Sequence, residues 1–202
     1  GRVIILDAGS GLKNLGDALV TERELSLHML LTHAHWDHLC GFPFFAPAYL
    51  PQCRITLCGG PTAQESLQRY FKHQMLPPFF PVPFDGLQAQ LDFGCQCDQP
   101  CTGQVAKMAG RPGCYSVLLN HPDGGYGFKL EDKGRTFVFL PDNELGFHHP
   151  NGPGFEAQVE FCRGADLLFH DAQYTDAEYQ RTRGWGHSTY ADALRLATAA
   201  GV

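Results

Sequence analysis

The sequence is short of charge, and of positive charge in particular, and it has no long apolar run. Asp, Glu, Lys and Arg make up 18% of the 202 residues, and 15 Lys and Arg stand against 21 Asp and Glu, for a net charge of −6. A chain with this balance offers no obvious basic face, so we expect no long nucleic acid as a partner. No run reaches the length of about 20 apolar residues that a membrane helix needs, so we also expect no membrane partner.

The eight cysteines lack the regular spacing of a secreted disulfide scaffold. We therefore expect a reducing, cytoplasmic environment. Cys95, Cys97 and Cys101, with Cys114 further on, are candidates for a structural metal, although their spacing is not the usual Cys-x₂-Cys. Free buried thiols or a local disulfide are the alternative.

The chain opens without an initiator methionine or a signal peptide, directly on the apolar stretch Val3–Leu6. Its length and its 44% of apolar residues allow one domain with an ample core. We expect a single domain over residues 1–202 that is truncated or partial. No internal repeat or low-complexity segment interrupts it.

Histidine and aspartate gather at one place, directly after an apolar run that ends at Leu31. The stretch from residue 32 to residue 38 reads Thr-His-Ala-His-Trp-Asp-His. Imidazole nitrogen and carboxylate oxygen suit zinc and neighbouring metals. In an extended chain His33 and His35 point to the same side, so both can bind one metal. Asp37 and His38 lie beyond the turn and can reach a second one.

Other polar residues stand just past predicted strands. The periodicity and the turn residues predict strands at Val3–Leu6, Ser26–Leu31, Arg54–Cys58, Tyr115–Asn120, Thr136–Leu140 and Asp166–Phe169, and helices at Leu12–Glu24, Phe155–Cys162 and Tyr190–Ala200. His121, Asp142 and His170 each follow one of these strands, as His33 does. The ends of such strands can share one rim of a sandwich.

The spelling His-x-His-x-Asp-His resembles the signature of the metallo-β-lactamase superfamily. The resemblance implies an α/β fold, a four-layer αββα sandwich with two metals at one edge, and we expect this chain to lack the first strands of that fold. It further implies that a lone His, a bridging Asp and a final His complete the site, and His121, Asp142 and His187 are the matching positions. The implied set is His33, His35 and His121 for one metal, Asp37, His38 and His187 for the other, and Asp142 between them.

The resemblance also implies a mechanism. Two divalent ions, zinc with manganese or iron as alternatives, would hold a bridging hydroxide as nucleophile. No Ser or Cys nucleophile presents a convincing triad. An Asp at the position of Asp7 supports the histidine loop from behind in the family, and a turn-stabilising Asp is the alternative there.

The C-terminal part of the chain indicates which branch of the superfamily the sequence resembles. Leu168-Phe-His170-Asp171-Ala172, followed by Gly186-His187-Ser188-Thr189, resembles the phosphodiesterase branch, which includes tRNA 3′-processing endonucleases and cyclic-phosphate hydrolases. His170 and Asp37 are then the predicted catalytic residues, His170 as proton donor. Asp171 departs from the Glu of the family, and a buried, hydrogen-bonded histidine is the alternative for His170.

Only about 20 residues separate His121 from Asp142, and they are predicted to form a hairpin. The tRNA-processing enzymes insert a long basic arm there, so we expect a small phosphodiester substrate instead, such as a cyclic nucleotide or cyclic ribose phosphate. A lactonase or thioester hydrolase with the same metals is the main alternative. Phosphate would favour a cation such as Lys129 or Arg135, and a lactone a donor such as Tyr174. A non-catalytic metal-binding module is the second alternative, and a homodimer stays open.

Overall fold

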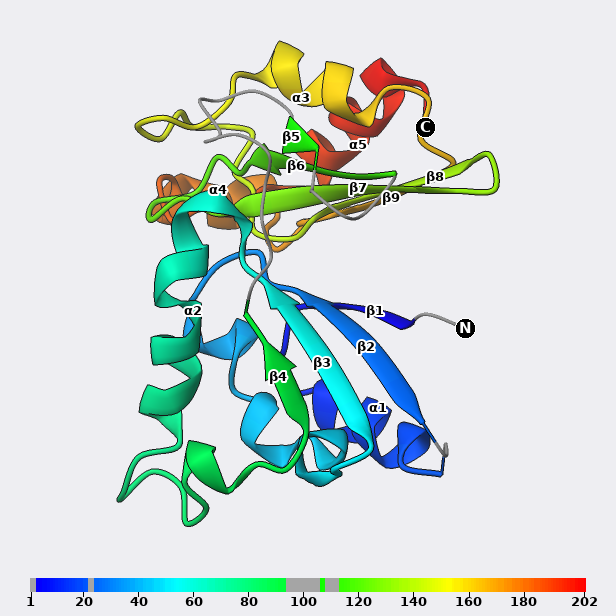
Figure 1. Cartoon of the computed structure of the whole chain (residues 1–202). Helices are drawn as coiled ribbons and strands as arrows, with labels where there is room; N and C mark the ends of the chain where they lie inside the picture. Colours follow the sequence, from blue (N-terminus) through cyan, green and yellow to red (C-terminus); the bar gives the residue numbers. More distant parts are fainter. Residues whose placement is uncertain (1–2, 22–23, 94–105, 108–112) are drawn as a thin grey trace. The chain divides into compact units, whose positions relative to one another are not determined.

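The computed structural model describes residues 3–21, 24–93, 106–107 and 113–202. It divides the chain into two compact units, residues 1–95 and residues 96–202, which we call the N-terminal and the C-terminal unit (Figure 1). Each unit is built around its own sheet, and the two are described separately.

The sheet of the N-terminal unit is parallel throughout, in the order β1-β2-β3-β4. Its elements are β1 (Val3–Leu6), α1 (Leu12–Leu19), β2 (Leu25–Leu30), β3 (Cys53–Cys58), α2 (Gly60–Gln74) and β4 (Gln90–Asp92), with the short helices η1 (Trp36–His38), η2 (Phe42–Phe44), η3 (Ala46–Tyr49) and η4 (Phe84–Gly86). Parallel strands require crossover connections, which here are α1, the η1–η3 segment and α2.

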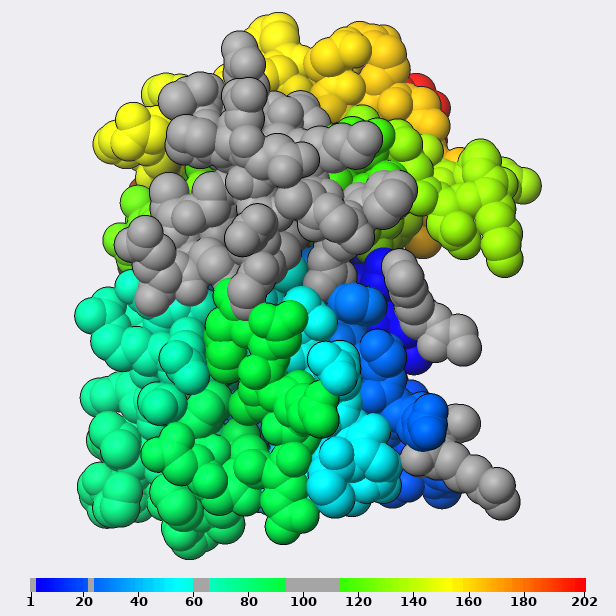
Figure 2. All heavy atoms as spheres, in the orientation of Figure 1, coloured from blue at the N-terminus to red at the C-terminus, as the bar shows by residue number. Residues whose placement is uncertain are grey.

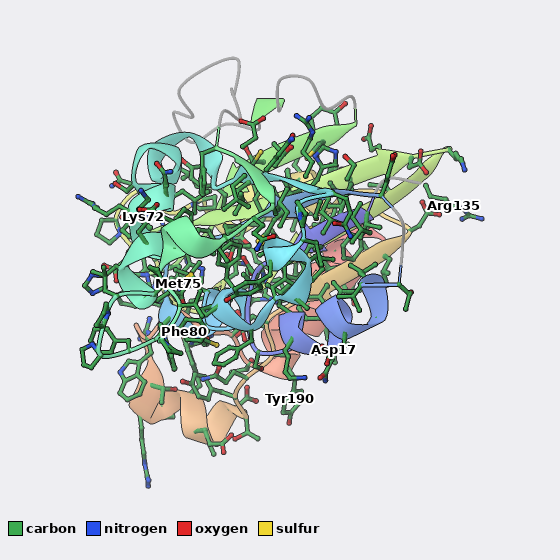
Figure 3. All side chains as sticks on the ribbon, turned by 60° about the horizontal axis from the view of Figure 1, so that its bottom comes forward. Asp17, Lys72, Met75, Phe80, Arg135 and Tyr190 are labelled. Atoms are coloured by element: carbon green, nitrogen blue, oxygen red, sulfur yellow. The ribbon has the colours of Figure 1, made fainter. Side chains whose placement is uncertain are left out.

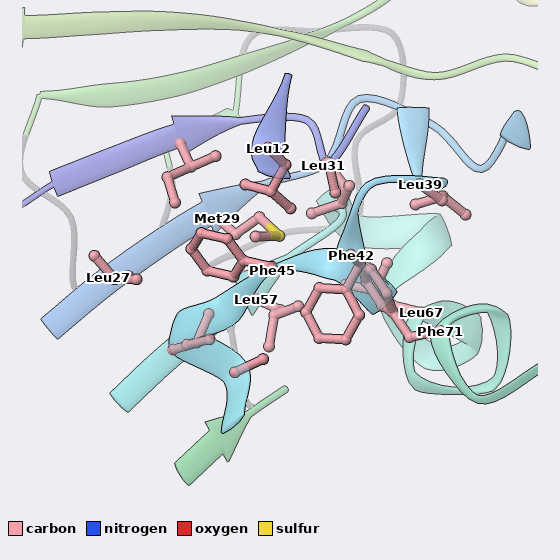
Figure 4. Close-up of a cluster of buried hydrophobic side chains, with 14 of the residues drawn as sticks. Leu12, Leu27, Met29, Leu31, Leu39, Phe42, Phe45, Leu57, Leu67 and Phe71 are labelled. Atoms are coloured by element: carbon pink, nitrogen blue, oxygen red, sulfur yellow. The ribbon is translucent and has the colours of Figure 1, made fainter. Parts of the chain in front are cut away.

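The core of the N-terminal unit extends to the chain that follows the histidine motif. Met29 of β2 and Leu57 of β3 are fully buried, and so are Phe42 and Phe45 of the η2–η3 segment and Phe71 of α2 (Figure 4). The phenylalanine rings of η2 and α2 pack at a centroid distance of 4.2 Å. The motif therefore lies between a central strand and a buried aromatic anchor, which fixes both of its ends.

The C-terminal unit has a sheet of order β5-β6-β7-β8-β9, antiparallel except for the parallel pair β8–β9. Its elements are β5 (Ala106–Lys107), β6 (Cys114–Leu118), β7 (Tyr126–Asp132), β8 (Arg135–Leu140), α3 (Phe155–Cys162), β9 (Leu167–His170), α4 (Asp176–Thr182) and α5 (Tyr190–Ala200). Helices α3 and α5 cover one face of this sheet (Figure 1), and Val138 and Leu140 pack there against Phe161 and Leu196.

Both units combine a sheet with helices, as the α/β expectation requires. The predicted helix Leu12–Glu24 is too long, because α1 ends at Leu19 and β2 already begins at Leu25. The residues after the helix, Val20 and Thr21, are β-branched and lower helix propensity. Within the described residues no helix is both long and apolar enough to span a membrane.

Of the four cysteines predicted as candidates for a structural metal, one lies within the described residues. Cys95, Cys97 and Cys101 lie outside the described residues, and Cys114 is buried. Cys53 and Cys162 are buried free thiols. Burial raises the pKa of Cys53 to about 11 and that of Cys162 to about 12, so both stay protonated at neutral pH.

The aromatic anchor gives a stability prediction. We expect Phe42→Ala to lower the free energy of unfolding by about 3–5 kcal/mol, because the ring is 0% exposed and its removal leaves a cavity. Phe79→Ala is the matched control, since that ring is 70% exposed, and it should change the value by about 0.5 kcal/mol or less. Chemical denaturation measures both, and equal losses would contradict this account of the core.

Candidate metal centre

Three histidines of the N-terminal unit form a tight group. The ring centroids of His33 and His35 are 4.5 Å apart, and those of His33 and His38 are 4.2 Å apart. His33 is 7% exposed, whereas the Asp37 side chain is 76% exposed and its Oδ2 lies 3.4 Å from Nε2 of His38. The loop after β2 thus gathers three imidazoles and one carboxylate, as the spacing predicts.

Asp7 holds this loop from behind. Its Oδ1 accepts a hydrogen bond from the backbone N–H of Thr32 at 2.7 Å, and its Oδ2 accepts one from Nδ1 of His38 at 2.8 Å. The Thr32 hydroxyl donates to the same carboxylate at 2.9 Å. Because that hydroxyl has its only hydrogen committed to Asp7, it accepts from Nδ1 of His33, 3.0 Å away.

These contacts select one tautomer for both histidines. His33 and His38 carry their proton on Nδ1, so Nε2 is the nitrogen with the lone pair that a metal binds. The supporting role expected for Asp7 therefore has a geometric basis. Asp7 has a φ of 60°, a conformation that Asp and Asn adopt more readily than most residues.

Two glycines let the backbone close around the motif. The N–H of Ala8 donates to the carbonyl of His38, and the N–H of Gly41 donates to the carbonyl of Ala8, both at 2.8 Å. A Cβ on Gly9 would lie 2.7 Å from the carbonyl oxygen of Asp37, and one on Gly41 would collide with the backbone of Gly9. Only glycine permits this approach.

The C-terminal unit brings together its own three predicted ligands. The ring centroids of His121 and His187 are 5.8 Å apart, and Nε2 of His187 lies 4.0 Å from Oδ2 of Asp142. His121 is 2% exposed, and its Nδ1 donates to the carbonyl of Gly186 at 3.1 Å. Gly186 has a φ of 95°, and any side chain there would collide with the His121 ring.

Asp171 does in this unit what Asp7 does in the other. Its Oδ2 accepts from Nδ1 of His187 at 3.0 Å, from the N–H of Ser188 at 3.1 Å and from the N–H of Asn143 at 3.3 Å. His187 and His121 thus carry their proton on Nδ1 as well, which leaves Nε2 as the metal-binding atom. The aspartate at position 171, which departs from the family Glu, is long enough to reach the histidine.

His170 is engaged on both nitrogens. Its Nδ1 donates to the carbonyl of Asp171 at 2.6 Å, and its Nε2 accepts from the side-chain amide of Asn143 at 2.9 Å. Burial lowers its pKa, and the interactions with Asp171 and Asp192 only partly offset that effect. A neutral ring is consistent with both bonds. The proton-donor role of His170 stays a prediction, and these contacts favour the alternative of a buried, hydrogen-bonded histidine.

Asn143 and Asn120 join the two loops that carry His121 and Asp142. The side-chain oxygen of Asn143 accepts from the backbone N–H of Asn120 at 2.9 Å. Its amide donates to Gln158 of α3 as well as to His170. The residue before His121 is therefore hydrogen-bonded to the residue after Asp142, and this bond fixes the distance between the two predicted ligands.

Glu144 is a functional residue that the sequence interpretation missed. It is 0% exposed and accepts hydrogen bonds from Tyr179 Oη at 2.6 Å, from the N–H groups of Gly184 and Gly186 at 2.7 and 2.8 Å, and from His149 Nε2 at 2.7 Å. Burial raises its pKa, but these hydrogen bonds outweigh burial and hold the pKa below its usual value. Glu144 thereby anchors the loop that delivers His187.

The three residues considered for contact with the substrate lie at different places relative to the predicted ligands. Arg135 lies at the β7–β8 turn and pairs with Asp166 (Figure 3), and Nζ of Lys129 lies 4.8 Å from the ring centroid of Phe161 on α3. Neither contact directs a cation to the histidines. Tyr174 is closer to the predicted ligands of its unit, with its ring 6.1 Å from that of His187.

Comparison with known proteins adds three findings. Residues 2–202 match the family model described as the beta-lactamase superfamily domain. The chain is 56% identical over 48 residues to ribonuclease Z of Pseudomonas putida, covering 23% of this chain and 15% of that protein. It is 27% identical over 183 residues to ribonuclease Z of Bradyrhizobium diazoefficiens, covering 88% and 55%. The chain thus spans little more than half the length of the second relative.

A solved structure shows the same fold. The crystal structure of the short form of human tRNase Z has a TM-score of 0.66 to this chain at 21% identity, covering 98% of this chain and 78% of that one. The expected metallo-β-lactamase fold is confirmed. The expectation that long nucleic acid is excluded as a partner is wrong, because the curated relatives of this chain are named ribonuclease Z. A net charge summed over the whole chain could not establish that exclusion.

The contact between Asp7 and His38 is testable. We expect Asp7→Asn to lower metal affinity by about 10- to 100-fold, because Asn tolerates the backbone of Asp7 but binds Nδ1–H of His38 without charge. Asp17→Asn is the control, since Asp17 makes only an exposed ion pair with Lys13 on α1. Competition with a chromogenic chelator measures the affinity. An unchanged affinity in Asp7→Asn would show that Asp7 does not support the loop.

The buried carboxylate of Glu144 gives a second prediction. We expect Glu144→Gln to destabilise the protein by about 1.5–3 kcal/mol, because an amide replaces one of two oxygens that accept hydrogen bonds. Glu156→Gln on the exposed first turn of α3 should leave stability within about 0.5 kcal/mol. Thermal and denaturant unfolding report the difference, and equal stability of the two variants would rule out an anchoring role for Glu144.

Proposed function

Because the chain belongs to the beta-lactamase superfamily, we propose that it is a metal-dependent hydrolase that cleaves phosphodiesters. The names of the relatives support this reaction class, since a ribonuclease hydrolyses the phosphodiesters of RNA. The observation that carries the proposal is that Nδ1 of four histidines lies within hydrogen-bond distance of an oxygen, which leaves Nε2 of each histidine for a metal.

We propose that the ligands of both units together hold two divalent ions, zinc in the first place, with manganese or iron as alternatives. Neutral imidazoles and two carboxylates form a donor set that suits such ions. The proposed ligands are His33, His35 and His121 for one ion, Asp37, His38 and His187 for the other, and Asp142 for both.

The chemistry divides between the ions and the chain. When bound, the ions would lower the pKa of a water molecule to about 7 and polarise the phosphate. The chain orients the ligands through Asp7 and Asp171, keeps each imidazole in one tautomer, and holds the loop of His187 with Glu144. Asp37, largely exposed, is the ligand that lies nearest to solvent and hence to an entering substrate.

The substrate that we propose is a small phosphodiester, a cyclic nucleotide or cyclic ribose phosphate. Strands β7 and β8 pair from Phe128 with Phe139 to Asp132 with Arg135, so the chain between His121 and Asp142 is occupied by one hairpin. This short hairpin is the feature that favours a small substrate. RNA is the second candidate substrate, which the names of the relatives favour. A lactonase is the remaining alternative, because Tyr174 lies beside His187.

A substrate panel tests the reaction class. Protein loaded with zinc or manganese should hydrolyse a bis-aryl phosphate, a cyclic nucleotide or a short RNA faster than a lactone, a thioester or a β-lactam. Asp142→Ala and His187→Ala should each reduce that rate by at least about 100-fold, because a ligand of the metals is lost. His148→Ala, which changes an exposed histidine, should retain the rate.

Each outcome has a distinct meaning. A faster rate on lactones would reject the phosphodiesterase and retain a hydrolase. Full activity in both ligand variants would reject the metal site, and a protein that binds metal but hydrolyses none of the panel would be a binding module.

A further inference from the structure

A large cavity in the N-terminal unit opens beside the histidine motif. Its volume is about 860 Å³, within the range of about 300–1,000 Å³ that small-molecule sites occupy. The residues of its wall that bear on the argument are Lys13, Trp36, Phe44, Gln74, Phe79 and Phe80. They come from α1, from the η1–η2 segment, and from the end of α2 with the segment that follows it, which lies on the surface of this unit (Figures 2 and 3).

The wall of the cavity consists largely of exposed aromatic rings. Trp36 is 72% exposed, Phe44 is 57% exposed and Phe79 is 70% exposed. Phe44 and Phe80 pack edge to face at a centroid distance of 5.3 Å, so the Phe80 ring supports a Phe44 ring that remains largely exposed. Rings of this kind, held in place but left accessible, are the surfaces on which flat aromatic ligands stack.

Polar groups accompany the rings. Both side-chain amide atoms of Gln74 are shielded from solvent and have no hydrogen-bond partner among the described residues. An unsatisfied amide costs free energy, and a small rotation of the Gln74 side chain toward the cavity would let a ligand offering a donor beside an acceptor recover it. Lys13 on α1 makes only an exposed ion pair with Asp17, which is weak and can be exchanged for an anionic ligand.

Residues within and directly after the histidine motif line the cavity. Trp36 stands between His35 and Asp37, both proposed ligands, and Cys40, which also lines the cavity, follows His38 by two residues. A group bound against Trp36 therefore contacts the residue that stands between two proposed ligands.

We propose that this cavity binds the nucleobase next to the scissile phosphate, stacked on Trp36 and Phe44 and hydrogen-bonded to Gln74. The proposal rests on the proposed phosphodiesterase function and names the substrate class as a nucleotide or the end of an RNA. An acyl chain would fill the apolar volume but leave the Gln74 amide without a partner, and a base-free sugar phosphate would leave the rings bare.

The binding is measured without catalysis, on metal-free protein. The chain has two tryptophans, so in a Trp185→Phe background Trp36 is the only one and reports on the cavity. We expect adenosine monophosphate to quench its fluorescence saturably, and ribose 5-phosphate and dodecyl phosphate to bind at least about tenfold more weakly, because they lack a base to stack.

Two variants test the wall in the same background. Phe44→Ala and Gln74→Leu should each weaken adenosine monophosphate binding by about fivefold or more, from lost stacking or hydrogen bonding. Leu76→Ala is the control, since Leu76 is 50% exposed on the same segment and does not line the cavity. Its binding should be unchanged. Circular dichroism checks that all three fold.

Equal binding of ribose 5-phosphate, tighter binding of dodecyl phosphate, or variants that bind like the control would overturn the nucleobase site. If the protein still hydrolyses phosphodiesters in that case, the proposed function stands without the cavity. If it binds adenosine monophosphate as expected but hydrolyses no phosphodiester, the function falls and the cavity remains a nucleobase site.

Discussion

The proton on Nδ1 is the constraint on which the site depends. A metal-binding histidine is useful only if its other nitrogen has an acceptor, because that bond fixes both the tautomer and the ring orientation. In the N-terminal unit Asp7 and Thr32 provide the acceptors, and in the C-terminal unit Asp171 and the carbonyl of Gly186 provide them. Each unit thus contains one buried aspartate, Asp7 or Asp171, that accepts a hydrogen bond from a histidine. The same aspartate also accepts from backbone N–H of the loop that carries a predicted ligand.

The acidic residues of the site therefore have different roles. Asp7 and Asp171 are 9% exposed and have their oxygens occupied by hydrogen bonds, so they position ligands. Asp37 is largely exposed and is suited to bind a metal directly. Glu144 supports the loop that carries His187, since it accepts hydrogen bonds from the N–H groups of Gly184 and Gly186. Glycine at 9, 41 and 186 is required because ligand loops pass too close for a side chain.

Much of this could be predicted from the sequence where the signal is local. The motif spacing predicted the histidine group. The capping box of α4 is local in the same way, because Thr175 and Glu178 are only three residues apart. Thr189 likewise caps α5. Glu144 could not be found in this way, because its partners Tyr179 and Gly184 are 35 and 40 residues away. The early end of α1 was missed because no glycine or proline follows Leu19 before β2 to mark the end of the helix.

The exclusion of long nucleic acid failed for a related reason. Net charge is a sum over the chain, whereas binding to phosphate depends on the local field, and bound metal ions reverse the sign of that field in the site. With metal ions bound at the proposed ligands, an acidic chain would therefore not need a basic face to attract a phosphate. Recognition by stacking at the Trp36 cavity fits this balance, because stacking needs no net positive charge.

The central proposal is the ligand set in which His33 and His121 bind the same ion, and metal stoichiometry tests it most directly. Zinc content per chain should be measured after equilibrium dialysis for the wild type, for His33→Ala, for His121→Ala and for the double variant. Our account predicts two ions for the wild type and one ion for each of the three variants, because both substitutions remove ligands of one ion. A double variant that retains no ion, or single variants that retain two, would contradict it.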